Sequence, residues 1–298
     1  MKRRTFLKTF SAGLVVSGFM DPTDLFSFAG ENGSVVSIAR GDDPALLTAK
    51  AVEALGGMSK FVSRGDVVLV KPNMGWDRTP EQAANTNPDV VATLVRLAFE
   101  AGAKKVKVFD NTCNSARRCY KRSGIAAAAE AVGANVTFVE ERKFKKTNLE
   151  GEVLSEWPVY EEALEADKII NVPIAKHHTL ARLTLCMKNF MGLIGGRRNL
   201  LHQKLDTNVV DLASFFKPTL TVLDAYRILT ANGPQGGNLK DVETTKTIAA
   251  STDQVAIDAF GTTLFGMTAD AFPHIRKAHE RGMGEHDLSK VKLIENTV

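Results

Sequence analysis

The chain has 298 residues, of which 44% are hydrophobic and 24% are charged. This composition is that of an ordinary globular protein, and the length suffices for a full core without disulfide or metal staples. The formal net charge of +4 comes from 38 basic and 34 acidic residues, so we expect no nucleic-acid partner. Three cysteines are too few for an iron–sulfur cluster with four cysteine ligands from this chain alone.

Residues 1–29 predict an export signal. Residues 2–8 read Lys-Arg-Arg-Thr-Phe-Leu-Lys, which is typical of a twin-arginine signal peptide, and Ser27-Phe28-Ala29 offers small residues for signal peptidase. The apolar run from Phe10 to Met20 is too short for a permanent membrane span. Removing this segment takes away four basic and two acidic residues, which lowers the formal net charge from +4 to +2. We therefore expect a periplasmic or otherwise extracytoplasmic protein; the alternative is a basic N-terminal helix of the mature chain.

Short apolar runs alternate with helical patterns in the rest of the chain. The predicted strands are Ser34–Ala39, Asp66–Lys71, Lys105–Asp110, Asn135–Glu140, Lys168–Val172, Leu220–Asp224, Thr247–Ser251 and Val291–Glu295. The predicted helices are Pro44–Leu55, one from Pro88 that ends at Gly102, Gly124–Val132, Val159–Ala166, Leu180–Leu193, Asn208–Phe216, Asp253–Phe265 and Ala269–Arg281. The alternation predicts an α/β fold, with a mostly parallel sheet covered by helices on both faces in a three-layer sandwich. We expect residues 30–298 to form a single domain, with a hairpin or loop at Lys143–Glu152.

Polar side chains follow four of these strands at their carboxyl ends. In chain order they are Lys71 with Asn73, Asp110, His177 with His178, and Asp224. Ligands of open parallel sheets bind outside the carboxyl ends of the strands. We therefore expect these residues to share one site.

Histidines are concentrated in residues 171–202, which contain three of the six in the chain. A ligand set such as His177 or His178, His202, and Asp110 or Asp224 would suit zinc, iron or nickel, with His177, His178, His202 and Asp110 as the first candidates. The spacing matches no strong metal motif. Neutral histidines that hydrogen-bond to the backbone near an anion site are an equal alternative.

Lys188 lies in an otherwise apolar segment, where a buried ammonium is costly unless it is paired or placed at a ligand site. It would pair with Asp110 or Asp224, bind an anionic substrate, or carry a proton. The alternative is a surface lysine whose stem alone is buried.

Two glycine-containing turns offer further anion-binding groups. Arg197 and Arg198 follow a Gly-Gly pair, and guanidinium groups recognise carboxylate or phosphate. In the segment from Asn232 and Gly233 to Gly237, backbone amides could hold an anion, although the pattern also fits an ordinary turn.

The remaining cysteines and histidines carry weaker predictions. Cys113 and Cys119 are the pair best suited to a disulfide, with free thiols as an equal alternative. We expect His274, His279 and His286 to be surface residues.

Several motifs, in their order along the chain, resemble the uncharacterised family called domain of unknown function 362. They are Val70-Lys71-Pro72-Asn73, Asn171-Val172-Pro173, Lys176-His177-His178, Met187-Lys188-Asn189, Gly196-Arg197-Arg198, Asp224-Ala225, Asn232-Gly233-Pro234 and Ala256-Ile257-Asp258-Ala259. The resemblance covers nearly all of the chain after the predicted signal. Many family members carry a ferredoxin-type cysteine cluster and look redox-associated, whereas this chain lacks the cluster. A distant similarity to lactate racemase, a nickel-cofactor enzyme with histidine acid–base pairs, is an analogy only.

Together these features predict an exported, metal- or cofactor-dependent enzyme that uses acid–base chemistry on a small anionic substrate, in association with a redox partner protein. The catalytic candidates are His177, His178, Lys188 and Asp224, and the anion-binding candidates are Lys71, Asn73, Arg197, Arg198, Asn232 and Gly233. The cofactor is open, with a transition metal as the first candidate. The alternative function is a periplasmic metal- or anion-binding delivery protein without turnover.

Overall fold

A ten-stranded mixed sheet runs through the computed structural model, which describes residues 33–298. The predicted signal peptide, residues 1–29, lies outside the described residues. The strands are β1 Val35–Arg40, β2 Val67–Pro72, β3 Lys105–Val108, β4 Asn135–Val136, β5 Phe144–Asn148, β6 Glu156–Tyr160, β7 Lys168–Val172, β8 Ile174–His178, β9 Arg182–Thr184, β10 Leu220–Leu229, β11 Val242–Ser251 and β12 Lys292–Thr297. The helices are α1 Pro44–Glu53, α2 Pro88–Glu100, α3 Ala116–Arg122, α4 Ile125–Ala131, α5 Glu161–Leu164, α6 Cys186–Asn189, α7 Leu205–Phe216, α8 Gln254–Thr263 and α9 Pro273–Glu280.

The strand order in the sheet is β12-β1-β11-β10-β7-β2-β3-β4, with β8 paired to β10 and β9 paired to β8. The pairs from β10 through β7, β2 and β3 to β4 are parallel, as are β1 with β12 and β10 with β8. β11 runs antiparallel to both of its neighbours. The predicted mostly parallel sheet is therefore confirmed.

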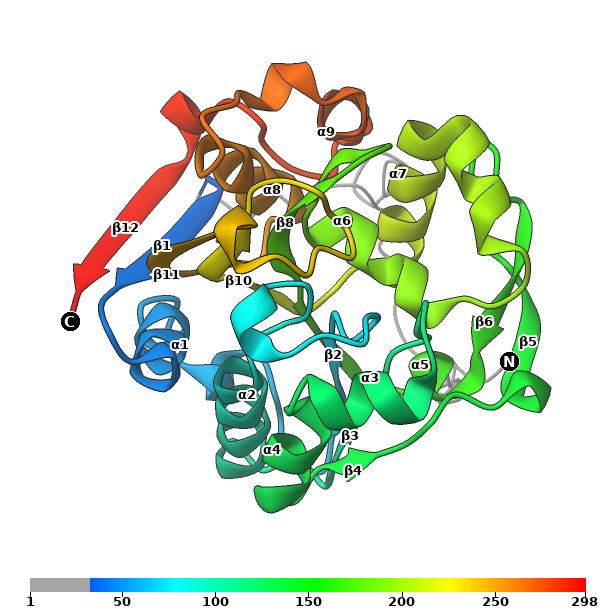
Figure 1. Ribbon diagram of the computed structural model, residues 1–298, viewed down its shortest axis with the longest axis horizontal. Coiled ribbons are helices and arrows are strands. Elements are labelled where there is room, and N and C mark those ends of the chain that lie inside the picture. The colour runs from blue at the N-terminus through cyan, green and yellow to red at the C-terminus, as the bar shows by residue number, and fades with distance from the viewer. Residues whose placement is uncertain (1–32) are drawn as a thin grey trace, which may run out of the picture. The chain divides into compact units, whose positions relative to one another are not determined.

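Helices cover both faces of the sheet (Figure 1). On one face, α1, α2 and α4 pack against the strands, and on the other α6 and α8 do so, with α7 and α9 beside them. Alternate side chains of β2 point to opposite faces of the sheet. Val68 and Val70 belong to the hydrophobic core between the sheet and α2, and Leu69 belongs to the core on the other face. The three-layer prediction is confirmed, and the apolar strand runs are explained by burial on both faces.

The largest correction to the predicted elements concerns Leu180–Leu193. The single helix predicted there is wrong, because Arg182–Thr184 forms strand β9 against β8 and only Cys186–Asn189 is α-helical. The buried Asp258 carboxylate accepts the backbone N–H groups of Cys186 at 2.7 Å and Met187 at 3.2 Å. This carboxylate caps the short helix from a distant part of the chain, so local periodicity could not locate its start.

The hairpin or loop predicted at residues 143–152 contains β5, which pairs antiparallel with β6 in a separate two-stranded sheet. The predicted helix Val159–Ala166 is reduced to Glu161–Leu164 because the preceding residues, up to Tyr160, extend along β5.

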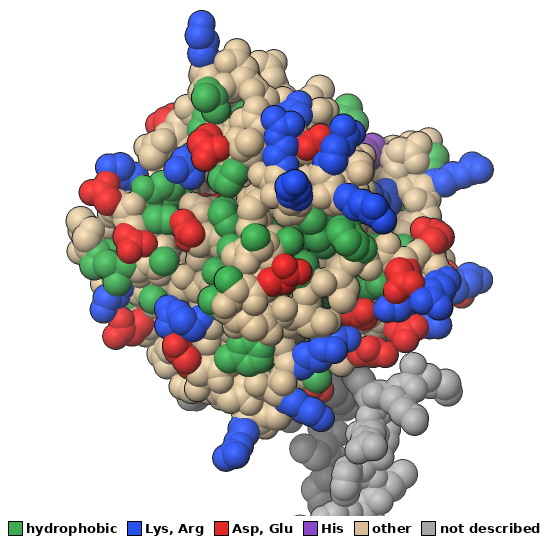
Figure 2. All heavy atoms as spheres, turned by 60° about the horizontal axis from the view of Figure 1, so that its bottom comes forward, with side chains coloured by type: hydrophobic (Ala, Val, Ile, Leu, Met, Phe, Trp, Pro, Cys, Tyr) green, Lys and Arg blue, Asp and Glu red, His purple; other side chains and the backbone are tan. Residues whose placement is uncertain are grey.

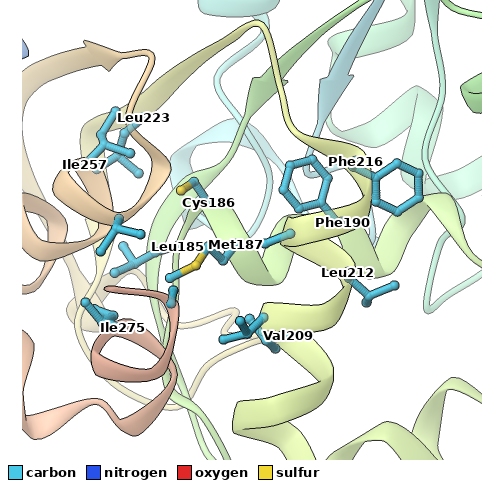
Figure 3. Close-up of a cluster of buried hydrophobic side chains, with 14 of the residues drawn as sticks. Leu185, Cys186, Met187, Phe190, Val209, Leu212, Phe216, Leu223, Ile257 and Ile275 are labelled. Carbon is cyan, nitrogen blue, oxygen red and sulfur yellow. The ribbon is translucent and has the colours of Figure 1, made fainter. Parts of the chain in front are cut away.

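Apolar side chains fix the segment that contains Lys188. Figure 3 shows Leu185, Met187 and Phe190 among side chains from α7, α8 and β10. The rings of Phe190 and Phe216 stack with their centroids 5.3 Å apart. The short helix α6 is therefore held by packing as well as by its cap.

Acidic and basic side chains are spread over the face shown in Figure 2 rather than separated by sign. Among the helices within residues 33–298, none has the length and hydropathy that crossing a bilayer requires.

Candidate functional site

A buried ion pair between Lys71 and Asp110 lies at the carboxyl ends of β2 and β3. The Lys71 Nζ lies 2.9 Å from Asp110 Oδ1, and both side chains are almost fully buried. The other oxygen of Asp110 accepts the backbone N–H of Met74 at 2.6 Å. Adjacent parallel strands thus bring together two of the predicted site residues that are 39 positions apart in sequence.

Gly192 provides the space that the ion pair occupies. A Cβ atom at this position would lie 1.8 Å from Asp110 Oδ1 and 2.6 Å from Lys71 Nζ. The Gly192 carbonyl also accepts the backbone N–H of Asn111 at 2.9 Å. The backbone after α6 therefore approaches the pair closely, and a larger residue has no room here.

Amide side chains connect the ion pair to a second lysine. Asn189 Oδ1 accepts from Lys71 Nζ and from Asn73 Nδ2, each at 3.1 Å. Asn73 Oδ1 in turn accepts from Lys176 Nζ at 3.0 Å, and Lys176 also donates to the carbonyl of Ala84. Four separate segments of the chain meet in this network.

Lys176 and Lys188 make this region rich in positive charge. Unlike Lys71, neither forms an ion pair with a carboxylate in residues 33–298; Lys188 Nζ has only a weak contact with Met191 Sδ at 3.5 Å. Burial lowers the pKa of Lys176 to about 7, and burial together with the nearby Arg198 lowers the pKa of Lys188 to about 8. Burial also lowers the pKa of Lys71, against the opposing effect of Asp110. Lys176 and Lys188 can therefore exchange protons near neutral pH.

The histidines of the predicted site lie on β8, which holds His177 and His178, and on a 3₁₀ segment, which holds His202. His178 Nδ1 accepts the backbone N–H groups of Leu180 and Ala181, each at 3.1 Å. Its ring stacks on that of His202 with centroids 5.8 Å apart. Burial and the nearby Lys188 lower the pKa of His178 to about 3 and also lower that of His202. His178 is therefore neutral at physiological pH, with its proton on Nε2.

The predicted ligand set of His177, His178, His202 and Asp110 is not brought together. In the part of the chain that the structure describes, these four do not provide three ligand atoms within 4.8 Å of one another. The Nδ1 atoms of both His177 and His178 accept backbone N–H groups, and Asp110 is bound to Lys71. As arranged, these residues do not fit a metal.

The predicted arginines and glycine loop mostly satisfy other parts of the protein. Arg198 donates to the carbonyl groups of Asn111 at 2.7 Å and Thr112 at 2.9 Å, while Arg197 is exposed. The backbone N–H of Gly233 donates to His177 Nδ1 at 3.1 Å, so it is not free for an anion. Asn232 is also exposed and donates to Asp241 at 2.9 Å.

Asp224 does not join the lysine network. Its carboxylate accepts the backbone N–H groups of Asn87 at 2.7 Å and Tyr226 at 3.0 Å. Burial raises its pKa to about 6 despite these two hydrogen bonds. The observed contacts fasten the start of α2 to β10, and no hydrogen bond joins Asp224 to His177 within residues 33–298.

For the cysteines the structure shows the free-thiol alternative, and one of the histidine predictions is corrected. All three cysteines are free, with Cys113 exposed and Cys119 buried. The prediction of a surface residue is wrong for His274, which is 6% exposed and lies 3.4 Å from Asp206.

Lys176, Asn189 and Asn171 also belong to the network, although the sequence did not identify them as site residues. Asn189 Nδ2 donates to Asn171 Oδ1 at 2.8 Å, and Asn171 Nδ2 donates to the carbonyl of Cys186 at 2.9 Å. The signal for Lys176 was a lysine after the apolar pair Ile174-Ala175, which the neighbouring histidines obscured. Two cavities, of about 470 and 280 Å³, lie elsewhere, and neither is lined by these residues.

The fold and this network define an α/β protein with a buried cationic site at the carboxyl edge of a mostly parallel sheet. Residues 68–263 match the family model described as Domain of unknown function (DUF362), and the chain belongs to this family. A thylakoid-associated protein of Synechocystis sp. is 29% identical over 240 residues, which cover 78% of this chain and 73% of the relative.

Two solved structures resemble the fold. The lactate racemase apoprotein from Thermoanaerobacterium thermosaccharolyticum has 10% identity and a TM-score of 0.46, over 76% of this chain and 56% of that one. A Thermotoga maritima protein solved by a structural genomics consortium has 14% identity and a TM-score of 0.37, over 81% and 60%. The chain thus spans less than two thirds of the length of either solved protein.

Proposed function

We propose that this protein is an enzyme that performs acid–base chemistry on a small anionic substrate at the lysine network. One observation carries the proposal: within residues 33–298, Lys176 and Lys188 have no carboxylate partner, whereas Lys71 has Asp110. A buried cation without a counter-ion is costly, and an anionic ligand would remove much of that cost. The charge imbalance therefore favours a small carboxylate or phosphate compound.

The protonation states suit proton transfer. General acids and bases work best with a pKa near the operating pH, and the pKa values of Lys176 and Lys188 are lowered to about 7 and about 8. In this proposal Lys188, which is only partly buried, carries the proton. Neutral His178 donates a hydrogen bond from Nε2, and the Asn73–Lys176 pair holds the anionic group. His177 supports the site indirectly through its hydrogen bond to Gly233.

We also propose that the protein acts outside the cytoplasm and with a redox partner. The twin-arginine pattern of residues 2–8 supports export. The resemblance to family members with cysteine clusters supports the redox association. No described residue is assigned to a cofactor in this proposal.

Hydrogen exchange in D₂O tests for turnover. The purified protein is incubated in D₂O with a panel of small carboxylates and phosphate esters, and carbon-bound deuterium is measured by mass spectrometry. At least one compound should exchange, and Lys188→Met should slow that exchange by about a hundredfold or more. The exposed Lys240→Met is the matched control and should leave the rate unchanged.

The alternative function predicts a different result. A compound that raises the melting temperature but shows no exchange would identify a binding or delivery protein and contradict the enzyme. Exchange that survives Lys188→Met would contradict the role given to this lysine.

A further inference from the structure

Three side chains far along the chain from the lysine network form a group of a different kind. His279 lies near the end of α9, and Glu285 and His286 lie in the loop that follows. Each offers one ligand atom, and the three atoms lie within 4.8 Å of one another. Within residues 33–298, no other group of three or more histidine, cysteine or acidic residues brings its ligand atoms this close together.

The contact between Glu285 and His286 has the spacing of metal ligands. Glu285 Oε1 lies 3.4 Å from His286 Nδ1. Ligands about 2.0–2.2 Å from a tetrahedral zinc ion lie about 3.4 Å from one another. Small side-chain adjustments would therefore suffice to bind an ion between them.

One nitrogen of each imidazole already has a neighbour that fixes the ring. His279 Nδ1 lies 2.8 Å from the carbonyl oxygen of Gly284, which leaves Nε2 available. His286 Nε2 lies 3.4 Å from Asp270 Oδ1. Metal-binding histidines are typically held in this way, by a carbonyl or carboxylate on the nitrogen that does not bind the ion.

The Nδ1 atom of His286 supplies independent support. It is buried and has no hydrogen-bond partner among the described residues. A buried polar atom without a partner is unfavourable, and a bound cation would satisfy it. The centroids of the two imidazole rings are only 4.3 Å apart, so both side chains can reach one ion.

The backbone of the loop is fixed in a way that positions these ligands. Asp253 caps α8 through Val255 and Ala256 and accepts the backbone N–H of Glu285 at 2.8 Å. A Cβ atom on Gly284 would lie 1.9 Å from Asp253 Oδ1, so the loop approaches this carboxylate closely. The ligand-bearing loop is thus tied to a helix of the core.

We propose that His279, Glu285 and His286 bind a divalent transition metal ion, for which zinc is the first candidate. Two nitrogen ligands and one carboxylate suit zinc and leave a fourth position for water. The site adjoins a cavity of about 470 Å³ that His286 and Asp270 help to line, so a small ligand could reach it. This proposal is independent of the lysine network.

Zinc titration of the metal-stripped protein tests the site. Isothermal titration calorimetry should show one zinc ion bound per chain, with a rise in melting temperature because the ion binds only the folded state. Glu285→Gln and His286→Ala should each weaken binding by at least about tenfold. Glu280→Gln, which changes an exposed carboxylate on α9, should bind zinc as the unaltered protein does.

Two results would overturn the proposal: no zinc uptake by the unaltered protein, or uptake that neither variant weakens. Glutamine at position 285 can still accept the backbone N–H of Asp287, which lies 2.8 Å from Glu285 Oε1. Circular dichroism without metal confirms that each variant is folded, so lost binding reports on the ligands.

Discussion

Gly192 lies where any side chain would displace the buried ion pair. We expect Gly192→Ala to separate Lys71 from Asp110, because its Cβ would lie 1.8 Å from the carboxylate. Breaking a buried pair should lower the free energy of unfolding by about 3 kcal/mol or more, measured by urea denaturation. Gly75→Ala is a stringent control, since a Cβ there meets the same carboxylate at an ordinary 4.0 Å. Equal losses in the two variants would contradict this account of Gly192.

The pKa of Lys176 predicts a pH dependence of stability. Below pH 7 this lysine is charged in both the folded and the unfolded chain, and the cost of burying the charge is present in full. Between about pH 7 and its ordinary pKa of 10.5, the folded chain has released a proton that the unfolded chain retains. The contribution of Lys176 to stability therefore rises with pH over this interval.

Comparison with Lys176→Met isolates this contribution. Between pH 7 and pH 9 the unaltered protein should gain about 2 kcal/mol in the free energy of unfolding relative to the variant. Urea denaturation at both pH values provides the measurement. A difference between the two proteins that does not change with pH would show that Lys176 keeps its proton when buried.

The short helix α6 depends on a cap that comes from another element. Asp258 of α8 accepts the first two backbone N–H groups of α6, and Asn189 on the same helix completes the lysine network. Asp258→Asn leaves one of those N–H groups unsatisfied, so we expect a loss of about 2 kcal/mol in the free energy of unfolding. Glu100→Gln, which removes an exposed ion pair with Arg96, should cost less than about 1 kcal/mol. Equal costs in urea denaturation would argue against the cap.

Elements with a local signal were predictable from the sequence. The run Lys168–Val172 coincides with β7, and the cap and proline at Asn87-Pro88 mark the start of α2. Strands β8 and β9 were not predictable, because Lys176, His177 and His178 are polar in a strand that is mostly buried. Their conformation is fixed by pairing with each other and by the contact of β8 with β10, which local sequence does not encode.

The same limit applies to the candidate site. The rule that ligands bind at the carboxyl ends of parallel strands correctly joined Lys71, Asn73 and Asp110. The rule failed to exclude Asp224, which lies within β10 of the same sheet and accepts the backbone N–H of Asn87 at the start of α2. Which polar residues at one edge face one another depends on side-chain direction, and Asn189 enters only through tertiary packing.

At the scale of the whole molecule, the proposed export has a direct test. Replacement of Arg3 and Arg4 together by lysine should leave most of the precursor in the cytoplasm of a host with a twin-arginine exporter. Cell fractionation and immunoblotting provide the measurement, and Lys8→Arg, which keeps the arginine pair, should still be exported. Full export of the double-lysine protein would contradict the assignment of this pathway.

The pairing of β1 with β12 sets an order of events during synthesis. Residues 35–40 lie between partners at residues 247–250 on one side and 292–297 on the other. A ribosome delivers β1 early and both of its neighbours more than 200 residues later. This edge of the sheet must therefore close after nearly all of the chain has emerged, and such long-range pairing is slow. Until then, the hydrogen-bonding groups and apolar face of β1 are open to chaperones and to mispairing with other chains.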